Sequence, residues 1–293
     1  MTRASVCCLL LSAGVALGQV PPPPVAPPAD PPKPVKPPAP PPDTIPKLDT
    51  LPASPSTLVP VVAKVEVVES AVKGEEALAK ALADAKAAYG KTRDYSGYMV
   101  RQERIGGKLQ PEQTAEIRVR TEPFCIYTLT LAPKALFNQE LAFVSGRKED
   151  RVRVKPAGVA GVAGFTSVAP DDPKANADSK YTLPNTGIGA VLKRVEAALD
   201  AEKAAKHAPQ VIAAEYTFGD RKCTRYEIFC DRPHAKRFAA RMVLYVDAEH
   251  KLPVRFEAYD APKPGEKAGE LTECVSFVKL LFNAGLGDAV FDK

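Results

Sequence analysis

The sequence predicts an α+β fold that is mainly β, with an antiparallel sheet and two amphipathic helices. The clearest evidence lies in residues 238–247 and 252–260, where apolar and polar side chains alternate. Alternation with a period of two is typical of half-buried strands, and the short polar break at residues 248–251 favours a hairpin. Strands with one apolar face suit an antiparallel sheet. Two other stretches, 74–89 and 187–203, repeat their apolar residues at helical spacing.

The N-terminus has the features of a secretory signal peptide. Residues 1–18 contain Arg3, an apolar run over 6–17 and a small-residue end at 16–18. The apolar run is too short to cross a bilayer. The alternative, a buried N-terminal strand, fits poorly because a proline-rich tract follows directly. We therefore expect secretion across the inner membrane, to the periplasm or cell envelope.

Residues 19–61 are predicted to form a disordered linker. Most of the 30 prolines of the chain lie between residues 21 and 60, with few residues that suit a core. Such a tract favours solvated polyproline II, which spans ~3.1 Å per residue. It acts either as a passive tether or as a spacer or ligand that reaches another envelope protein.

The first predicted helix, 74–89, precedes the sheet. It places Leu78, Leu82 and Ala85 on one stripe, and Gly90 suits its C-terminal end. Thr186 is in position to cap the second helix, 187–203. Between the predicted strands and this helix, residues 156–186 have no sustained period, which is typical of a functional or loosely ordered segment.

Residues 62–293 are expected to form one domain with about nine to eleven strands, large enough for a single core. Alternating or continuous apolar runs bounded by turn residues define these strands. The predicted strands are 95–105, 115–122, 124–131, 141–144, 151–154, 211–219, 222–231, 237–247, 252–260 and 271–282.

The cysteines beyond the signal peptide are expected to be mostly unbridged, buried thiols. Cys223 and Cys230 lie in one predicted strand, so they are over ~20 Å apart. In a simple meander Cys274 lies two strands from Cys230, beyond the ~7 Å limit for bridged Cα atoms. Cys125 is the fourth of these thiols.

The sequence predicts no catalytic residue, no metal site and no cofactor. His207, His234 and His250 lie in polar stretches without the spacing of metal ligands. Neither a GxSxG nor a phosphate-binding GK[ST] motif is present. Cys125 beside His207 is a conceivable nucleophile and base, but nothing else supports this pair. We therefore expect a protein that is not an enzyme, and the small, interleaved net charge of +5 does not indicate nucleic-acid binding.

A charged cluster marks the first predicted hairpin. It contains Glu103, Arg104, Arg118 and Arg120. Cross-strand ion pairs on a solvated face explain such a cluster. The alternative is a docking patch for a partner or for anionic lipid headgroups.

Three stretches resemble a bacterial envelope family, domain of unknown function 1571. They are DYSGYMVRQERIGGKLQPEQTAEIRVRTEPFCIYTLTLAPKAL, TGIGAVLKRVEAAL, and LPVRFEAYD with the following strand and NAGLGDAVFD. The resemblance covers about residues 75–293. This family is similar to LolA-like lipoprotein carriers, which implies a curved antiparallel half-barrel whose concave face is covered by the two helices and holds acyl chains.

The apolar face of the predicted sheet is the candidate ligand surface, because residues of equal parity share one face of a strand. We predict that the protein binds a lipid or an acylated, lipoprotein-like ligand there. The alternative is a structural or adaptor module of the envelope, tethered by its proline-rich arm, whose own side chains fill the core. We also predict that the helix at 187–203 is a movable plug over a rigid sheet. The candidate residues are Ile117, Val119, Met242, Leu244, Phe256, Val275 and Phe277.

Overall fold

The computed structural model describes residues 71–293. The predicted signal peptide, the predicted linker and the first residues of the predicted domain lie outside this part of the chain. Within it, one antiparallel sheet contains all twelve strands. They are β1 (Asp94–Ile105), β2 (Lys108–Leu109), β3 (Gln113–Thr121), β4 (Phe124–Ala132), β5 (Glu140–Val144), β6 (Val152–Lys155), β7 (Thr166–Val168), β8 (Gln210–Phe218), β9 (Arg221–Phe229), β10 (Arg241–Asp247), β11 (Pro253–Tyr259) and β12 (Leu271–Phe282).

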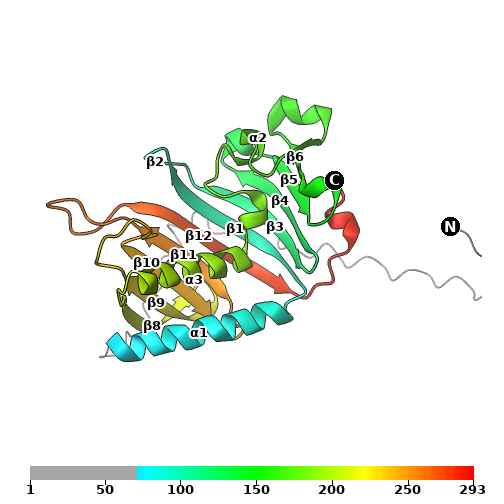
Figure 1. The fold of residues 1–293 in the computed structure, drawn as a ribbon. Helices are drawn as coiled ribbons and strands as arrows, with labels where there is room; N and C mark the ends of the chain where they lie inside the picture. Colours follow the sequence, from blue (N-terminus) through cyan, green and yellow to red (C-terminus); the bar gives the residue numbers. More distant parts are fainter. Residues whose placement is uncertain (1–70) are drawn as a thin grey trace, which may run out of the picture. The chain divides into compact units, whose positions relative to one another are not determined.

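The sheet consists of two meanders joined at β1. Its spatial order is β7-β6-β5-β4-β3-β1-β12-β11-β10-β9-β8, with the short β2 paired to β1 (Figure 1). We call β3–β7 the N-terminal wing and β8–β12 the C-terminal wing. β7 and β8 are the two edges, so the sheet is open and not rolled into a closed barrel. The predicted mainly β, antiparallel fold is confirmed, with twelve strands instead of nine to eleven.

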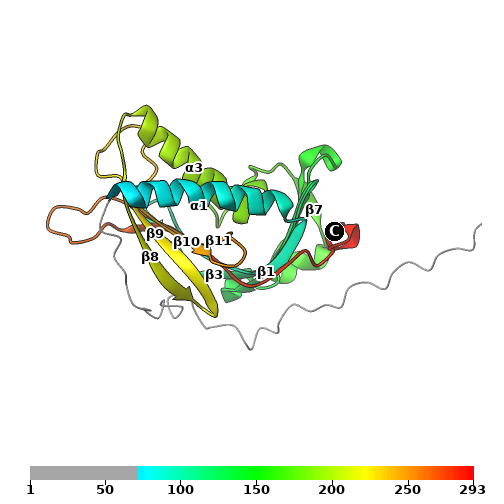
Figure 2. The ribbon, with the colours of Figure 1, turned by 90° about the horizontal axis from the view of Figure 1, so that it is seen from below.

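Two long helices lie on the same face of this sheet (Figure 2). Helix α1 (Ala71–Lys91) packs against β8, and helix α3 (Ile188–Ala204) packs against β11 and α1. Their apolar stripes face the sheet, as the helical spacing predicts. The buried side chains of the two helices are Leu78, Leu82, Ala85, Ile188, Val191, Leu192, Val195 and Ala198.

The chain between β7 and α3 covers part of the N-terminal wing. Its short helix α2 (Pro173–Asn176) contacts β6, and the 3-10 turn η5 (Leu183–Asn185) contacts β4 and β5. We call residues 169–187 the covering segment. The remaining 3-10 turns are η2 (Lys134–Leu136), η3 (Lys148–Asp150), η4 (Gly158–Ala163) and η6 (Asp288–Val290).

The structure differs from the sequence-based expectation mainly in its shortest elements. Residues 156–186, expected to lack structure, contain η4, β7, α2 and η5. Each is too short to show a helical or strand period, because proline and glycine interrupt the segment. The strand expected at 237–247 begins only at Arg241.

The C-terminal residues cover part of the face opposite the helices. Phe291 is buried there against Cys125, Tyr127 and Ala142. All four cysteines of the described residues are buried and unbridged, as expected. Among the helices of residues 71–293, none is long and apolar enough for a membrane span.

Candidate functional site

The predicted ligand-binding residues lie in a packed core beneath the helices. On the C-terminal wing, Leu244 pairs with Phe256 and Phe256 with Val275 in adjacent strands, so three predicted residues stand in one row. Met242 and Phe277 flank this row on the same face. All seven predicted residues belong to one apolar cluster with the helices, and their exposed fractions range from 0% to 8%.

Ile117 and Val119 lie on the other side of β1, in β3. Val119 pairs with Tyr95 of β1 and with Ile126 of β4, which continues the apolar face into the N-terminal wing. The sheet therefore brings the seven predicted residues to a single face, in two groups separated by β1. Their role toward a ligand remains a prediction.

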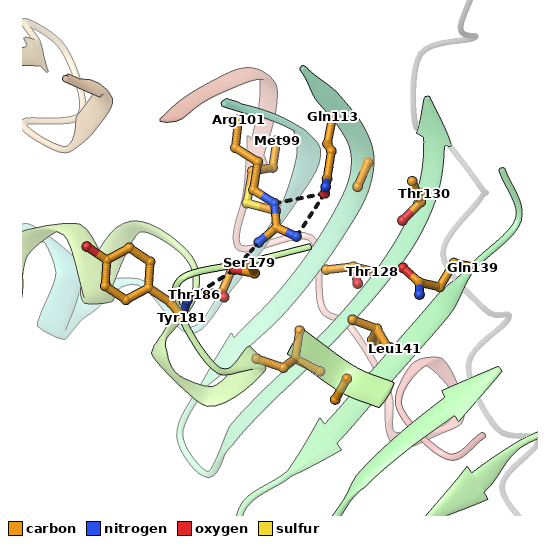
Figure 3. A pocket seen from close by; sticks show the side chains of 13 residues that line it. Met99, Arg101, Gln113, Thr128, Thr130, Gln139, Leu141, Ser179, Tyr181 and Thr186 are labelled. Carbon is orange, nitrogen blue, oxygen red and sulfur yellow. Dashed lines mark hydrogen bonds between the residues drawn. The ribbon is translucent and has the colours of Figure 1, made fainter. Parts of the chain in front are cut away.

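A small polar cavity interrupts this apolar face beneath the covering segment (Figure 3). Its volume is about 20 Å³, room for about one water molecule. The sheet contributes polar side chains to the lining from β1, β3 and β4, and the covering segment closes it from above. The lining includes Met99, Arg101, Gln113, Ala115, Thr128, Thr130, Gln139, Leu141, Ala175, Ser179, Tyr181, Leu183 and Thr186.

Arg101 joins the sheet to the covering segment. Its Nη1 donates to Ser179 Oγ at 2.8 Å, and its Nε and Nη2 donate to Gln113 Oε1 at 3.1 and 2.9 Å (Figure 3). Gln113 Nε2 in turn donates to the carbonyl of Asp178 at 3.1 Å. Burial lowers the pKa of the Arg101 guanidinium, opposed by Glu103 and Asp178. Arginine nevertheless stays charged in proteins, so a cation lies within this face.

Two buried carboxylates hold the next residues of the covering segment. Glu103 and Glu273 stand opposite each other in β1 and β12, and their exposed fractions are only 8% and 2%. Glu103 Oε2 accepts from the backbone N–H of Lys180 at 2.7 Å. Glu273 accepts from the Tyr181 hydroxyl and from Lys180 Nζ. We call Arg101, Gln113, Glu103 and Glu273, with residues 178–181, the polar latch.

Helix α3 continues the polar latch. Arg194 Nε lies 3.6 Å from Glu273 Oε1, and the Arg194 guanidinium stacks 4.0 Å from the centre of the Tyr181 ring. Burial, followed by the Glu273 charge, raises the pKa of the Tyr181 hydroxyl well above its ordinary value. Tyr181 therefore remains a hydrogen-bond donor at any physiological pH.

The start of α3 is fixed to β1 by Tyr95, which is fully buried. Its hydroxyl accepts from the backbone N–H of Ile188 at 2.9 Å. Gly187 makes this approach possible, because a Cβ there would lie 2.5 Å from the Tyr95 oxygen and its φ is +99°. The covering segment and the first turn of α3 are thus held by polar contacts to β1, β3 and β12.

The expectation of one charged cluster on a solvated face is wrong for Glu103, whereas Arg104, Arg118 and Arg120 share the face opposite the helices. Glu103 shares the helix-covered face with Arg101, whereas Arg104 points to the other side and pairs with Glu270 at 3.5 Å. Arg120 also lies on the other side, 2.6 Å from Asp288. Glu103 and Arg104 are consecutive in β1, so the alternation of a strand places them on opposite faces.

Residues 92–293 match the family described as protein of unknown function (DUF1571). Among curated proteins, none matches the sequence significantly. Several solved structures resemble the chain at low identity. An outer membrane lipoprotein-sorting protein domain from Vibrio parahaemolyticus is 12% identical, with 76% of this chain and 97% of that chain covered and a TM-score of 0.35.

Two further structures cover 73% of this chain. A LolA superfamily protein from Nitrosomonas europaea is 12% identical, with 97% of that chain covered and a TM-score of 0.29. The lipoprotein LppX from Mycobacterium tuberculosis is 10% identical, with 98% of that chain covered and a TM-score of 0.40. At these TM-scores the likeness assigns no ligand to this chain.

Proposed function

The chain belongs to the DUF1571 family, and we propose that it is a non-enzymatic protein of the cell envelope that binds a lipid or an acylated ligand. The ligand's acyl chain lies on the helix-covered face of the sheet, against the predicted residues on both sides of β1. It enters when the polar latch releases the covering segment. The predicted signal peptide supports the compartment.

The observation that carries this proposal is the polar latch itself. A core that only stabilises a fold gains little from buried ions, because desolvation of each charge offsets the attraction between them. Here Arg101, Glu103 and Glu273 lie within a mainly apolar face, and each of them bonds to one connecting segment, through Ser179, Lys180 and Tyr181. Water can replace such hydrogen bonds when the segment lifts, whereas it cannot replace apolar contacts.

Opening on this side brings an acyl chain to apolar side chains on both flanks of the polar cavity. Met99 of β1 lines the polar cavity and pairs with Phe277 of β12, so the cavity borders the C-terminal wing directly. On the other side, Leu141 of β5 lines the same cavity. An acyl chain that enters beneath the covering segment therefore meets apolar side chains in both directions, and its burial supplies the binding free energy.

Uptake of a fluorescent fatty acid by the full chain tests this proposal. We expect Arg101→Leu to speed uptake about tenfold, because loss of charged hydrogen bonds worth roughly 1.5–3 kcal/mol makes opening less costly. Arg104→Leu is the matched control, since Arg104 lies on the same strand but on the opposite face. If neither the wild type nor Arg101→Leu takes up the fatty acid, while circular dichroism shows that both are folded, the proposal is wrong.

A second function, a structural or adaptor module with a self-filled core, is favoured by the tight packing of the seven predicted residues. In that case the polar latch fixes one conformation instead of closing an entrance. Arg101→Leu then lowers stability without any uptake of fatty acid. Native mass spectrometry of the purified full chain separates the two functions, since only the first leaves acyl species bound.

A further inference from the structure

Three side chains of the kind that bind transition metals meet at the C-terminal end of α3. Glu202 lies in the last turn of α3, His207 precedes β8, and His234 lies between β9 and β10. One ligand atom from each lies within 4.8 Å of the others. Glu202 Oε1 is 2.8 Å from His234 Nε2, and Glu202 Oε2 is 3.6 Å from His207 Nδ1. Each carboxylate oxygen therefore faces a different imidazole.

The backbone after α3 turns back so that His207 returns to Glu202. Lys206 adopts a left-handed conformation with φ of 59°. The N–H of His207 then donates to the carbonyl of Glu202 at 2.9 Å. The two imidazole rings lie 5.5 Å apart with an angle of 70° between their planes. Two separate loops thus present their rings to one carboxylate.

One atom of this enclosed group lacks a hydrogen-bond partner within residues 71–293, the Nδ1 nitrogen of His207. This nitrogen is buried, and Glu202 is 2% exposed. A buried polar atom without a partner is costly, and such an atom in a native structure calls for an explanation such as an ion.

We propose that Glu202, His207 and His234 bind a zinc ion. Two histidines and one glutamate form a common zinc ligand set, which leaves a fourth position for water. Zinc bonds of about 2.0–2.2 Å in a tetrahedron place the ligand atoms roughly 3.4 Å apart. Glu202 Oε1 lies 2.8 Å from His234 Nε2 and Glu202 Oε2 lies 3.6 Å from His207 Nδ1, so a small rotation of the carboxylate brings one oxygen into position beside both nitrogens. The ion ties the end of α3 to the β9–β10 loop.

Binding requires a change at His234. Its Nδ1 now accepts from the N–H of Lys236 at 3.3 Å, so its proton is on Nε2, which faces Glu202. A metal-bound Nε2 carries no proton, and Nδ1 then carries it instead. The hydrogen bond from the Lys236 N–H to His234 Nδ1 is then lost, but it is long and exposed, so water replaces it. The positive charge of Arg237, which contacts the Cys230 carbonyl at 3.3 Å, opposes a cation. The negative charge of the buried Glu202 carboxylate offsets this repulsion between Arg237 and the zinc ion.

Titration calorimetry of the full chain with zinc chloride, after removal of metals with a chelator, tests the proposal. We expect one zinc ion per chain and an upward shift of the melting temperature, because a ligand that binds only the folded state stabilises it. His207→Ala and His234→Ala should each weaken zinc binding by at least about tenfold. His250→Ala, at the third histidine and next to Asp247, is the matched control and should bind as the wild type does.

His207 and His234 are only partly buried, so both variants should fold, which circular dichroism checks. The absence of zinc binding to the wild type overturns the proposal. So does undiminished binding in both histidine variants. Zinc binding is measured independently of fatty-acid uptake, so the zinc site and the proposed lipid function are tested separately.

Discussion

Beneath α1 and α3, the C-terminal wing presents Leu244, Phe256 and Phe277, whereas beneath the covering segment the sheet presents Arg101 and Gln113. Burial of one large apolar side chain stabilises by roughly 1.5–3 kcal/mol. One hydrogen bond contributes about 0.5–1.5 kcal/mol net, or about 1.5–3 kcal/mol when one partner is charged, and water is an adequate alternative partner in both cases. One sheet face is thus closed by apolar packing at one end and by polar contacts at the other.

This difference indicates where the face opens. Separation of α3 from β11 exposes apolar surface to water, which opposes the movement. Separation of residues 178–181 from the sheet exposes groups that water can solvate. The prediction of a movable plug is therefore narrowed to the covering segment around residues 178–181, because Ile188 and Val191 at the start of α3 are fully buried in the apolar core. In this proposal the contacts of the polar latch break when the entrance opens, and the packed C-terminal wing stays rigid.

The largest expected effect follows from a charge placed in the apolar region. Phe256→Glu should lower the free energy of unfolding by several kcal/mol, because Phe256 is fully buried and a carboxylate there has no partner. Urea denaturation measures this loss. Phe137→Glu is the control, since Phe137 is 47% exposed and the same substitution should change little. A fully stable Phe256→Glu protein would show that the C-terminal wing is open to water.

A smaller effect is expected where the covering segment joins α3. Gly187→Ala should cost about 1–3 kcal/mol, because an alanine is strained at φ of +99° and its Cβ meets the Tyr95 oxygen. Gly90→Ala is the control. A Cβ at Gly90, near the end of α1, meets nothing within 4 Å, and alanine favours a helix by about 0.5–1 kcal/mol. Equal thermal stability of the two variants would contradict the role assigned to Gly187.

The smallest expected effect belongs to a single latch contact. Ser179→Ala removes the acceptor for Arg101 Nη1 and should lower the free energy of unfolding by about 1.5 kcal/mol, the lower end of the range for a hydrogen bond to a charged group. Ser145→Ala, on an exposed turn, is the control. Urea unfolding of both proteins measures the difference. A loss above about 3 kcal/mol would resemble that of a core residue and would remove the distinction between the two regions.

The C-terminal wing could be predicted from the sequence because its pattern is long and regular. Alternation through Met242, Leu244, Phe256 and Ala258 identifies two strands and their shared apolar face. The helical stripes likewise predict α1 and α3. Both signals are repeats of apolar residues at a fixed spacing along the sequence, which arise because one face of the strand or helix is buried.

The polar latch could not be predicted in the same way. Arg101 and Glu103 appear as ordinary charged residues of a strand, and only the register of β1 against β12 turns them toward the helices. The partners in residues 178–181 lie in a segment with no period. The group of Glu202, His207 and His234 was missed for a similar reason, because its members come from separate elements with no motif spacing.

Hydrogen exchange of the full chain, read by mass spectrometry, tests the central claim most directly. Local opening exposes amides in proportion to the population of the open state. We expect peptides from residues 178–187 to exchange faster than those from β10 and β11, and we expect a bound fatty acid to slow exchange in 178–187. Equal protection of the two regions, with no effect of fatty acid on either, would contradict an entrance beneath the covering segment.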